Sequence, residues 1–445
     1  MQLVAMGAQD VYLTGNPQIT FFKVVYRRHT NFSKECIAQT FSGSVPQTGE
    51  GSVTCTLARN GDLVQEIYLK ATLNADEVTI DGTVSIESID TVRVSSTAPA
   101  NGTLVRFSAD ISTTDGGATT DGVAITAGTI YEVVDVSGNT FKLKGVTWAA
   151  IDSNTTMVTH SSKLVLESVV LDKDITDLIK TVEVEIGGQK IDKHYSQWLD
   201  IYNELFETSH DYRNAMSLGT PGNNKTVYIP LRFWFNRNPG LALPLIALQY
   251  HEVKILMNLN VPTNSTMSDA NLLVNYLYLD TDERRRFAQV SHEYLIEQVQ
   301  YTGVENEGPI TMNFNHPVKA LFWTAGANPG NVKLQLNGHD RAAVQPHDYY
   351  HLVQPYESGL GHCGKSLHNV DRTWGPVVNS ADTHCVGMYS FCLKPAEHQP
   401  SGTCNFSRID NARLNIDTVT DLYLFAMNYN VLRIMSGMGG LAYSN

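Results

Sequence analysis

Short runs that alternate between apolar and polar residues, each closed by a glycine, proline or asparagine turn, recur along most of this 445-residue chain. The clearest run is IKTVEVEIGGQKI (179–191), in which valine and isoleucine alternate with glutamate before a Gly-Gly pair. A period of two residues is that of a half-buried strand, and a Gly-Gly pair favours a tight hairpin turn. Many short strands at regular spacing predict an all-β protein built from sandwiches or barrels.

Helical spacing is expected only in connections between strands. Residues 196–206 place their apolar side chains on one helical face, which predicts an amphipathic helix. A second, short helix is expected within 279–288, where Asp280 or Thr281 can cap it. Since 445 residues exceed what one core usually holds, two sandwiches of similar size are predicted, although no repeat is visible in the sequence.

The segment 74–162 differs in composition from the rest of the chain. It contains sixteen Thr and ten Ser, and its eleven acidic residues outnumber its four basic ones. Short alternating runs predict a folded β module inserted into a loop of the first sandwich, with a disordered Ser/Thr-rich spacer as the alternative. The large aromatic residues of the segment favour the folded module, because they give it something to bury. They are Phe107, Tyr131, Phe141 and Trp148.

Charge and cysteine content exclude some classes of protein. A formal net charge of −13 argues against direct nucleic-acid binding, which needs clustered Lys and Arg. The six cysteines are far apart in the chain, so reduced, buried thiols are predicted rather than a disulfide framework. The chain starts without the pattern of a signal peptide, and its most apolar stretch is too short to span a membrane, which predicts folding in a cytosol.

No candidate catalytic or metal site meets its requirements. HDYYH (347–351) spaces two histidines as in zinc proteases, but Asp348 replaces the catalytic Glu, and the flanking prolines indicate loop and strand instead of the required helix. GLGHCG (359–364) matches a dinucleotide-binding glycine pattern but lacks the surrounding strand and helix. A group of cysteines and histidines near the C-terminus lacks zinc-site spacing: Cys385, Cys392, Cys404, His384 and His398. We therefore expect no enzyme activity, no metal and no cofactor.

Six N-x-S/T sequons are potential glycosylation sites, although the ordinary pathway is not expected to use them without a secretory signal. They lie at Asn31, Asn101, Asn154, Asn224, Asn264 and Asn405.

Two C-terminal stretches, PSGTCNFSRIDNARL (400–414) and NYNVLRIMSGMGGLAYSN (428–445), closely resemble the major capsid proteins of large eukaryotic DNA viruses, the phycodnaviruses, iridoviruses and mimivirus relatives. Further matching pieces follow in the family's order, and only 74–162 lies outside the resemblance. They are GAQDVYLTGNPQITFFK (7–23), ARNGDLVQEIYLKATL (58–73), VEVEIGGQKIDKHYSQWLDIYNEL (182–205), IPLRFWFNRNPGLALPLIALQYHEVKI (229–255) and HEYLIEQVQ (292–300).

The resemblance implies a double jelly-roll, that is, two eight-stranded sandwiches with the additional module inserted in the first. It implies homotrimeric, pseudo-hexameric capsomers that are assembled in the host cytoplasm and tile the icosahedral shell of a virion above an internal membrane. Partners would be neighbouring capsomers and minor capsid and penton proteins. An arm (1–26) is expected near the membrane or minor proteins, followed by jelly-rolls at 27–282 and 283–445. The insert at 74–162 would project outward and could contact the host surface.

Under this interpretation the polar stretch 395–414 shapes a surface and does no chemistry. Pro400, Ser401 and Gly402 are expected to form a tight turn. Four further residues are expected to satisfy backbone groups between strands: Asn405, Ser407, Arg408 and Asp410. On one strand, Arg408 and Asp410 would share a face and could form an ion pair.

Two other classes of function remain as alternatives. A lectin-like or fibre protein could use β-sandwiches to attach to a host, but it would not carry the whole-chain match. An enzyme on a jelly-roll would need clustered His and Glu metal ligands, as in a cupin oxygenase, or a facing carboxylate pair, as in a glycosidase. No motif supports either enzyme.

Overall fold

The computed structural model places most of the chain in antiparallel β-sheets. It describes residues 8, 14–18, 20–24, 28–75, 78–80, 84–88, 91–94, 104–107, 111–112, 123–125, 130–143, 159–160, 164–167, 178–206, 217–218, 225–261, 265–325, 329–341, 343–360, 385–419 and 421–443.

The first sandwich consists of two facing sheets. One sheet has the order β1-β20-β3-β17-β16, with β18 paired to β3, and the other has the order β15-β14-β19-β2. The strands are β1 (Phe32–Gln39), β2 (Gly49–Thr56), β3 (Leu63–Ala75), β14 (Ile179–Ile186), β15 (Gln189–Tyr195), β16 (Ser217–Leu218), β17 (Lys225–Pro230), β18 (Leu243–Pro244), β19 (Val253–Val261) and β20 (Ser265–Leu279).

The second sandwich repeats this plan. One sheet has the order β21-β30-β23-β27, with β28 and β31 at its margins, and the other has the order β22-β29-β24-β25, with β26 paired to β24. The strands are β21 (His292–Glu305), β22 (Ile310–Thr311), β23 (Pro317–Ala325), β24 (Asn331–Leu336), β25 (His339–Asp340), β26 (Gln345–Pro346), β27 (Cys385–Ser390), β28 (Cys404–Asn405), β29 (Ala412–Ile416), β30 (Leu422–Met435) and β31 (Met438–Leu441).

The two sandwiches have the same topology. When the eight main strands of each are numbered in chain order, one sheet reads 1-8-3-6 and the other reads 2-7-4-5. This order is that of a jelly-roll, in which antiparallel strands form two Greek keys. The double jelly-roll predicted from the sequence is confirmed, and the duplication is visible in strand order although the sequence shows no repeat.

Alternation along the strands builds the two cores. In β14, Val182, Val184 and Ile186 are fully buried, whereas the glutamates between them are partly exposed, as the sequence predicts. The first core fills the space between the sheets of the first sandwich and also includes Ile296, Leu432 and Ile434 of β21 and β30. The second core lies between the sheets of the second sandwich and includes Leu321, Trp323 and Leu424.

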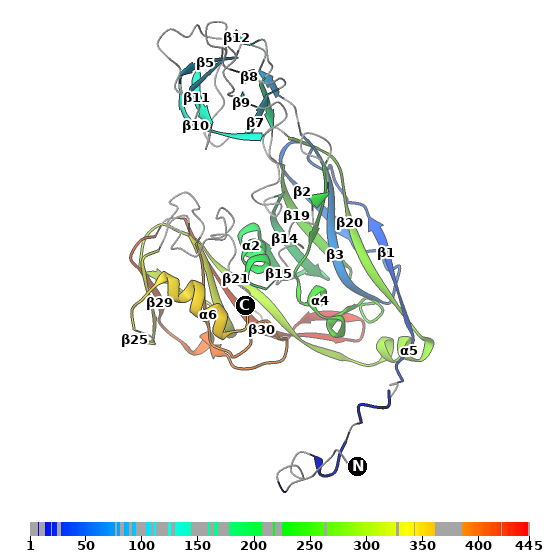
Figure 1. Cartoon of the computed structure of the whole chain (residues 1–445). Helices are drawn as coiled ribbons and strands as arrows, with labels where there is room; N and C mark the ends of the chain where they lie inside the picture. Colours follow the sequence, from blue (N-terminus) through cyan, green and yellow to red (C-terminus); the bar gives the residue numbers. More distant parts are fainter. Residues whose placement is uncertain are drawn as a thin grey trace, which may run out of the picture.

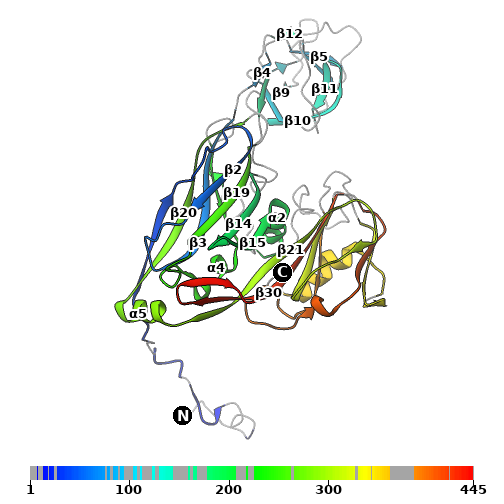
Figure 2. The same cartoon turned by 180° about the vertical axis from the view of Figure 1, so that it is seen from behind.

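The insert is a separate β module between the third and fourth strands of the first sandwich. Its sheet has the order β12-β5-β6-β11-β10-β7-β13-β4, and β8 and β9 form a small hairpin. The strands are β4 (Val78–Ile80), β5 (Val84–Ser88), β6 (Thr91–Val94), β7 (Leu104–Phe107), β8 (Ile111–Ser112), β9 (Val123–Ile125), β10 (Ile130–Ser137), β11 (Thr140–Leu143), β12 (Thr159–His160) and β13 (Leu164–Glu167). Phe141 is fully buried within it. The module lies at one end of the first sandwich, and the N-terminal segment leaves the opposite end (Figures 1 and 2).

Helices occur in the connections. Both predicted helices are confirmed, as α2 (Ser196–Leu205) and as α5 (Thr281–Gln289), in which the Asp280 carboxylate accepts a hydrogen bond from the Thr281 amide. Shorter helical segments are α4 (Trp234–Arg237), η2 (Pro239–Leu241), the π-helical η3 (Tyr349–Val353), α6 (Gln354–Glu357) and η5 (Phe406–Arg408). Within the described residues no helix is long and apolar enough to cross a membrane.

Two expectations from the sequence are wrong. Residues 349–357 form η3 and α6 where loop and strand were expected, because Pro355 sits in the first turn of α6, where a missing amide proton is tolerated. The described cysteines are free, but they are not all buried: Cys36 is exposed on β1, whereas Cys55 and Cys392 are buried.

Candidate functional site

The polar stretch that begins at Pro395 forms a loop and a short helical turn between strands of the second sandwich. A tight turn is predicted at Pro400, Ser401 and Gly402, but in the structure the turn of this loop lies at Pro395 and Ala396. The Ser401 hydroxyl accepts a hydrogen bond from the Lys394 amide at 3.0 Å. Gly402 has a φ of 137°, and an added Cβ would lie 3.0 Å from the Phe391 carbonyl oxygen. A glycine is therefore required there for both conformation and space.

Two of the next polar side chains of this stretch accept hydrogen bonds from backbone amides. The Asn405 side-chain oxygen accepts from the Ser407 amide at 3.1 Å, which caps η5. The Ser407 hydroxyl accepts from the His316 amide at 2.8 Å. Arg408 ends η5, and Asp410 lies in the turn before β29, so the two residues do not share a strand. These contacts tie the stretch to the chain that enters β23.

The two histidines of HDYYH lie close together but are used in packing. His347 is buried, its ring lies 6.0 Å from that of His351, and His351 Nδ1 lies 2.7 Å from the Val386 carbonyl oxygen. In the part of the chain that the structure describes, no group of three His, Cys, Asp or Glu residues could hold a metal ion. Residues 361–364 and His384 lie outside the described residues, as does the side chain of Cys385.

The burial of His347 predicts a pH dependence of stability. Burial, and to a lesser extent the charge of His351, lowers the pKa of His347 to about 4. The unfolded chain therefore binds more protons than the folded chain between pH 6.5 and pH 4, and folding stability falls as the pH drops through this window. The shift corresponds to roughly 3 kcal/mol. We expect urea unfolding of His347→Gln to lose less stability than the parent between these pH values. Parallel curves for the two proteins would contradict this assignment.

Four of the predicted glycosylation sites lie outside the described residues: Asn101, Asn154, Asn224 and Asn264. Asn31 and Asn405 are exposed, although the side-chain oxygen of Asn405 caps η5.

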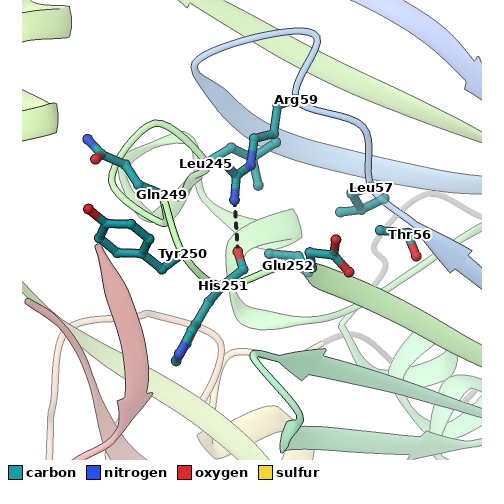
Figure 3. Close-up of a pocket in the computed structure, with 9 residues that line it drawn as sticks. Thr56, Leu57, Arg59, Leu245, Gln249, Tyr250, His251 and Glu252 are labelled. Atoms are coloured by element: carbon teal, nitrogen blue, oxygen red, sulfur yellow. Dashed lines mark hydrogen bonds between the residues drawn. The ribbon is translucent and has the colours of Figure 1, made fainter. Parts of the chain in front are cut away.

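A surface hollow of about 410 Å³ lies between the loops that join β2 to β3 and β18 to β19 (Figure 3). Arg59 is the cationic residue of its lining. The guanidinium donates to the carbonyl oxygens of Leu248, at 2.7 Å, and His251, at 3.3 Å. Because these bonds hold the 245–252 loop, Arg59 has a structural role here.

Among the described residues, an extensive set of contacts joins the two sandwiches. Helix α2 of the first sandwich packs on the sheet β21-β30-β23-β27 of the second (Figure 1). Trp198 is fully buried in this contact, with its ring 5.5 Å from that of Phe322 and 5.8 Å from that of Phe425. Ile201 and Leu205 follow on the same helical face and are also buried.

In this contact, α2 covers the outer face of the sheet β21-β30-β23-β27. The inner face of the same sheet covers the core of the second sandwich. Along β23, Leu321 and Trp323 point into the second sandwich, whereas Ala320 and Phe322 point toward α2. Eight consecutive residues of β23 are buried as a result. Sheets buried on both faces read as continuous apolar runs, and KALFWTA is such a run.

A buried ion cluster accompanies the aromatic contact. Glu297 of β21 pairs with Arg237 of the first sandwich and, at 2.6 Å, with the Lys319 ammonium of β23. Lys319 is fully buried and donates two further hydrogen bonds, to the carbonyl oxygens of Pro395, at 2.9 Å, and Glu397, at 3.0 Å. One carboxylate thus joins both sandwiches to the polar stretch.

His398 lies at the edge of this cluster, with its Nδ1 4.0 Å from the Glu297 carboxylate. Burial lowers the pKa of His398, although the Glu297 charge opposes this effect.

Hydrogen bonds between side chains and backbone groups also cross the contact. The buried Asp192 carboxylate of β15 accepts from the Val299 amide of β21 at 3.0 Å. The neighbouring Gln298 side chain donates to the Ile191 carbonyl oxygen and accepts from Asn430 of β30, the latter at 2.9 Å. His194 lies 2.9 Å from Asp192 and stacks on Phe233 at 4.5 Å. Buried groups held in this way fix the register of one sandwich on the other.

The β30–β31 hairpin of the second sandwich also contacts the first sandwich, through His251. The Gly439 amide donates to His251 Nδ1 at 3.2 Å, and the ring of His251 lies over the turn between β14 and β15. Gly187 and Gly188 in that turn both have positive φ, at 58° and 83°. A Cβ on Gly187 would overlap the His251 ring, whereas a Cβ on Gly188 would meet nothing within 4 Å.

These two glycines allow a matched test of the contact between the His251 ring and the β14–β15 turn. We expect Gly188→Ala to lower the free energy of unfolding by about 1 kcal/mol, from backbone strain alone. Gly187→Ala is expected to cost about 2–4 kcal/mol, because steric overlap with His251 is added to the strain. Urea unfolding of the two variants measures the difference. Equal losses would mean that His251 does not restrain the turn.

Sequence reasoning missed the residues of this contact. Arg237, Glu297 and Lys319 come from distant parts of the chain, and no local motif links them. The apolar run KALFWTA and the amphipathic helix were visible signals, but they do not indicate each other as partners.

Comparisons with known proteins agree with this architecture. The profile of a family described as "Major capsid protein N-terminus" matches residues 20–95 and 173–281. That of a family described as "Large eukaryotic DNA virus major capsid protein" matches residues 283–329 and 377–440.

Individual relatives match over the whole chain. The major capsid protein of Pyramimonas orientalis virus is 45% identical, with 100% of this chain and 99% of that protein covered. The major capsid protein of Paramecium bursaria Chlorella virus 1 is 36% identical over the same shares of both chains. Among solved structures, a quasi-atomic model of the PBCV-1 virus capsid matches with a TM-score of 0.65 at 32% identity, covering 96% of this chain and 100% of that chain.

Proposed function

Because the chain belongs to the family of major capsid proteins of large eukaryotic DNA viruses, we propose that it forms the shell of such a virus. Three copies associate into a capsomer, and capsomers tile an icosahedral surface. The function is structural, and no step requires a catalytic group, a cofactor or a metal.

The contact between the two sandwiches is the observation that carries this proposal. Two jelly-rolls of equal strand order lie side by side and are fixed by α2, the ion cluster and hydrogen bonds from side chains to backbone groups. A trimer of such a chain presents six similar sandwiches around its axis, which gives a threefold molecule a nearly hexagonal outline. Hexagonal outlines tile a surface without gaps, and a rigid contact keeps the outline constant between capsomers.

We assign the parts of the chain to this role as follows. Residues 1–26 are an arm, 27–282 the first jelly-roll with its insert at 74–162, and 283–445 the second jelly-roll. Support for the boundary near 282 comes from α5, which connects the last strand of the first sandwich to the first strand of the second.

The insert and the arm are proposed to mark the two faces of the shell. They leave opposite ends of the first sandwich (Figures 1 and 2). The insert would face outward, toward the host surface. The arm would face inward, toward an internal membrane or minor capsid and penton proteins, and its Phe21 and Phe22 are 89% and 98% exposed, ready for such a contact. Capsid images with the insert on the inner face would contradict this placement.

The polar stretch 400–410 is proposed to be architectural. Ser401, Gly402, Asn405 and Ser407 all hold or accommodate backbone groups, as expected for a segment that shapes a loop.

The mass of the purified protein in solution tests the proposal. Light scattering behind a sizing column is expected to give three times the 49.1 kDa of the chain, unchanged on moderate dilution. A protein that stays monomeric at every concentration would contradict self-assembly into capsomers. The alternative of a lectin-like attachment protein would then gain support, and glycan binding would be the next measurement.

A further inference from the structure

The surface hollow beside Arg59 lies at the end of the first sandwich from which the N-terminal segment leaves. The insert follows the last residue of β3, so the loop from β2 to β3, which lines the hollow, lies at the opposite end of that strand. Phe32, the first residue of β1, pairs with Leu279 of β20. Two residues earlier on β20, Leu277 pairs with Leu63 at the start of β3. The N-terminal segment and the hollow therefore share one end of the chain, away from the insert (Figures 1 and 2).

Arg59 has donors that the 245–252 loop does not use. Its hydrogen bonds to the carbonyl oxygens of Leu248 and His251 both come from one nitrogen, Nη2. Among the described residues, Nε and the second terminal nitrogen of Arg59 have no hydrogen-bond partner, and the side chain is exposed. Because a guanidinium carries five N–H donors, the remaining ones can bind the carbonyl oxygens of a peptide.

Tyr250 presents an aromatic ring that is fixed on one side. Its amide donates to the Gly437 carbonyl oxygen at 3.0 Å, and a Cβ on Gly437 would lie 2.6 Å from the ring. The ring thus rests on the β30–β31 turn, but Tyr250 is still 76% exposed. Met435 and Met438 flank the same turn and are half-exposed. Thioethers adapt their shape and contact aromatic rings favourably, so this rim of the hollow suits aromatic side chains.

Glu252 supplies a negative charge. It lies on the other side of Arg59 from Tyr250 (Figure 3). Its carboxylate is 67% exposed, and its ion pair with Lys254 is long, at 3.8 Å, and half-exposed. The hollow therefore offers an aromatic ring, free N–H donors and a carboxylate in that order. A peptide with aromatic side chains next to a cationic one complements this arrangement.

The N-terminal segment contains such a peptide, because Phe21 and Phe22 are followed directly by Lys23. The two rings are 89% and 98% exposed, so the single chain leaves them without cover. Ten residues separate Phe22 from Phe32, and an extended chain of that length spans about 35 Å. This reach exceeds the ~10 Å between the two sheets of a sandwich, so the segment can cross to a neighbouring chain.

We propose that Phe21–Lys23 of one chain docks in the hollow of a second copy. The phenylalanine rings lie on Tyr250 and the methionine rim, backbone carbonyl oxygens accept from Arg59, and the lysine ammonium pairs with Glu252. This inference rests on the proposed capsomer and adds an exchange of N-terminal segments between its chains. The hollow lies at the end that is proposed to face inward, so the exchange keeps the arms on that side.

Limited proteolysis tests the docking. Trypsin cleaves after Lys23, and a docked segment must leave the hollow before it can be cut. We expect cleavage after Lys23 to be roughly tenfold slower in the parent trimer than in the Tyr250→Ala/Glu252→Ala trimer. The control is Leu393→Ala, because Leu393 is 76% exposed, as Tyr250 is, and lies on a loop of the second sandwich; it should keep the slow cleavage of the parent. Light scattering and thermal unfolding verify that each variant is a folded trimer.

Cross-linking identifies the chain that provides the segment. Phe22→Cys and Tyr250→Cys are placed on two differently tagged chains that are produced together, both with Cys36→Ser because Cys36 is exposed. A short bis-maleimide should link the two tags in one species. Phe22→Cys together with Leu393→Cys should give no such species. A link that forms only when Phe22→Cys and Tyr250→Cys share one chain would overturn the exchange, since the segment would then fold back on its own hollow.

The outcomes separate this inference from the proposed function. A parent trimer that is cleaved after Lys23 as fast as the Tyr250→Ala/Glu252→Ala trimer, and that gives no link between the tags, would overturn the exchange and leave the capsid function standing. Fast cleavage of the Leu393→Ala trimer would overturn it as well, because the protection would not depend on the hollow. A parent that is monomeric at every concentration would contradict the capsomer itself, and the inference with it.

Discussion

Glu297→Ala is expected to lower the free energy of unfolding by roughly 3–5 kcal/mol. The substitution leaves the Lys319 ammonium, which is fully buried, without its carboxylate partner, and Arg237 loses the same partner. Removing one member of a buried ion cluster costs more than the cluster contributes, because the remaining charge stays desolvated. Equilibrium urea unfolding at a fixed protein concentration measures the loss.

Glu293→Ala is the matched control, since Glu293 lies on the same strand. Its ion pair with Arg433 is half-exposed on both sides, at 60% and 50%, so its removal is expected to cost at most about 1 kcal/mol. Similar losses for the two variants would mean that the cluster does not hold the sandwiches together. Glu297→Ala/Lys319→Met should recover part of the loss, because no unpaired ammonium then remains.

Trp198→Ala is expected to cost roughly 3–5 kcal/mol, through the cavity left between α2 and the second sandwich. Trp198 is fully buried and contacts the rings of Phe322 and Phe425, so the loss falls on the contact and not on either core. Trp198→Phe keeps part of the ring volume and should cost less. Calorimetry of both variants is the measurement.

The control for the tryptophan is Tyr443→Ala, because Tyr443 is 62% exposed. A change within about 0.5 kcal/mol is expected for it, as for exposed sites in general. A Trp198→Ala protein with unchanged melting would show that the sandwiches are held by other contacts. The melting endotherm carries more information, since a split into two transitions would show that the sandwiches unfold separately once this contact is lost.

The sequence predicted the fold well where the signal is local. Alternation in 179–186, the Gly-Gly turn and the Asp280 cap are encoded within a few residues of each other, and each was found where expected. The strand orders 1-8-3-6 and 2-7-4-5 pair strands that are far apart in the chain. The jelly-roll could therefore be expected only from the resemblance to a family.

Local signals failed where a neighbour decides the outcome. Pro355 reads as a helix breaker, yet it lies in the first turn of α6, where its missing amide proton is tolerated. Cys36 has the character of a buried thiol, but it lies on β1, an edge strand whose residues are mostly exposed. The position of a strand at the edge of its sheet is not encoded in the local sequence.

The candidate site was the least predictable part. Lys319 follows a proline and a valine in an apolar strand, and nothing in that sequence indicates a fully buried ammonium. Its burial is tolerated because Glu297 and two carbonyl oxygens lie within 3.0 Å, and these come from separate segments. The polar stretch 395–414 is rich in side chains that could do chemistry, but part of its role is to supply the carbonyl oxygens of Pro395 and Glu397 to Lys319.

Electron cryo-microscopy of the purified assembly tests the central claim most directly, because it shows how the sandwiches are arranged around the symmetry axis. The account predicts three chains around a threefold axis, with six similar sandwiches in a nearly hexagonal outline and all inserts at one end. A two-fold dimer, or a trimer with inserts and arms at the same end, would contradict it.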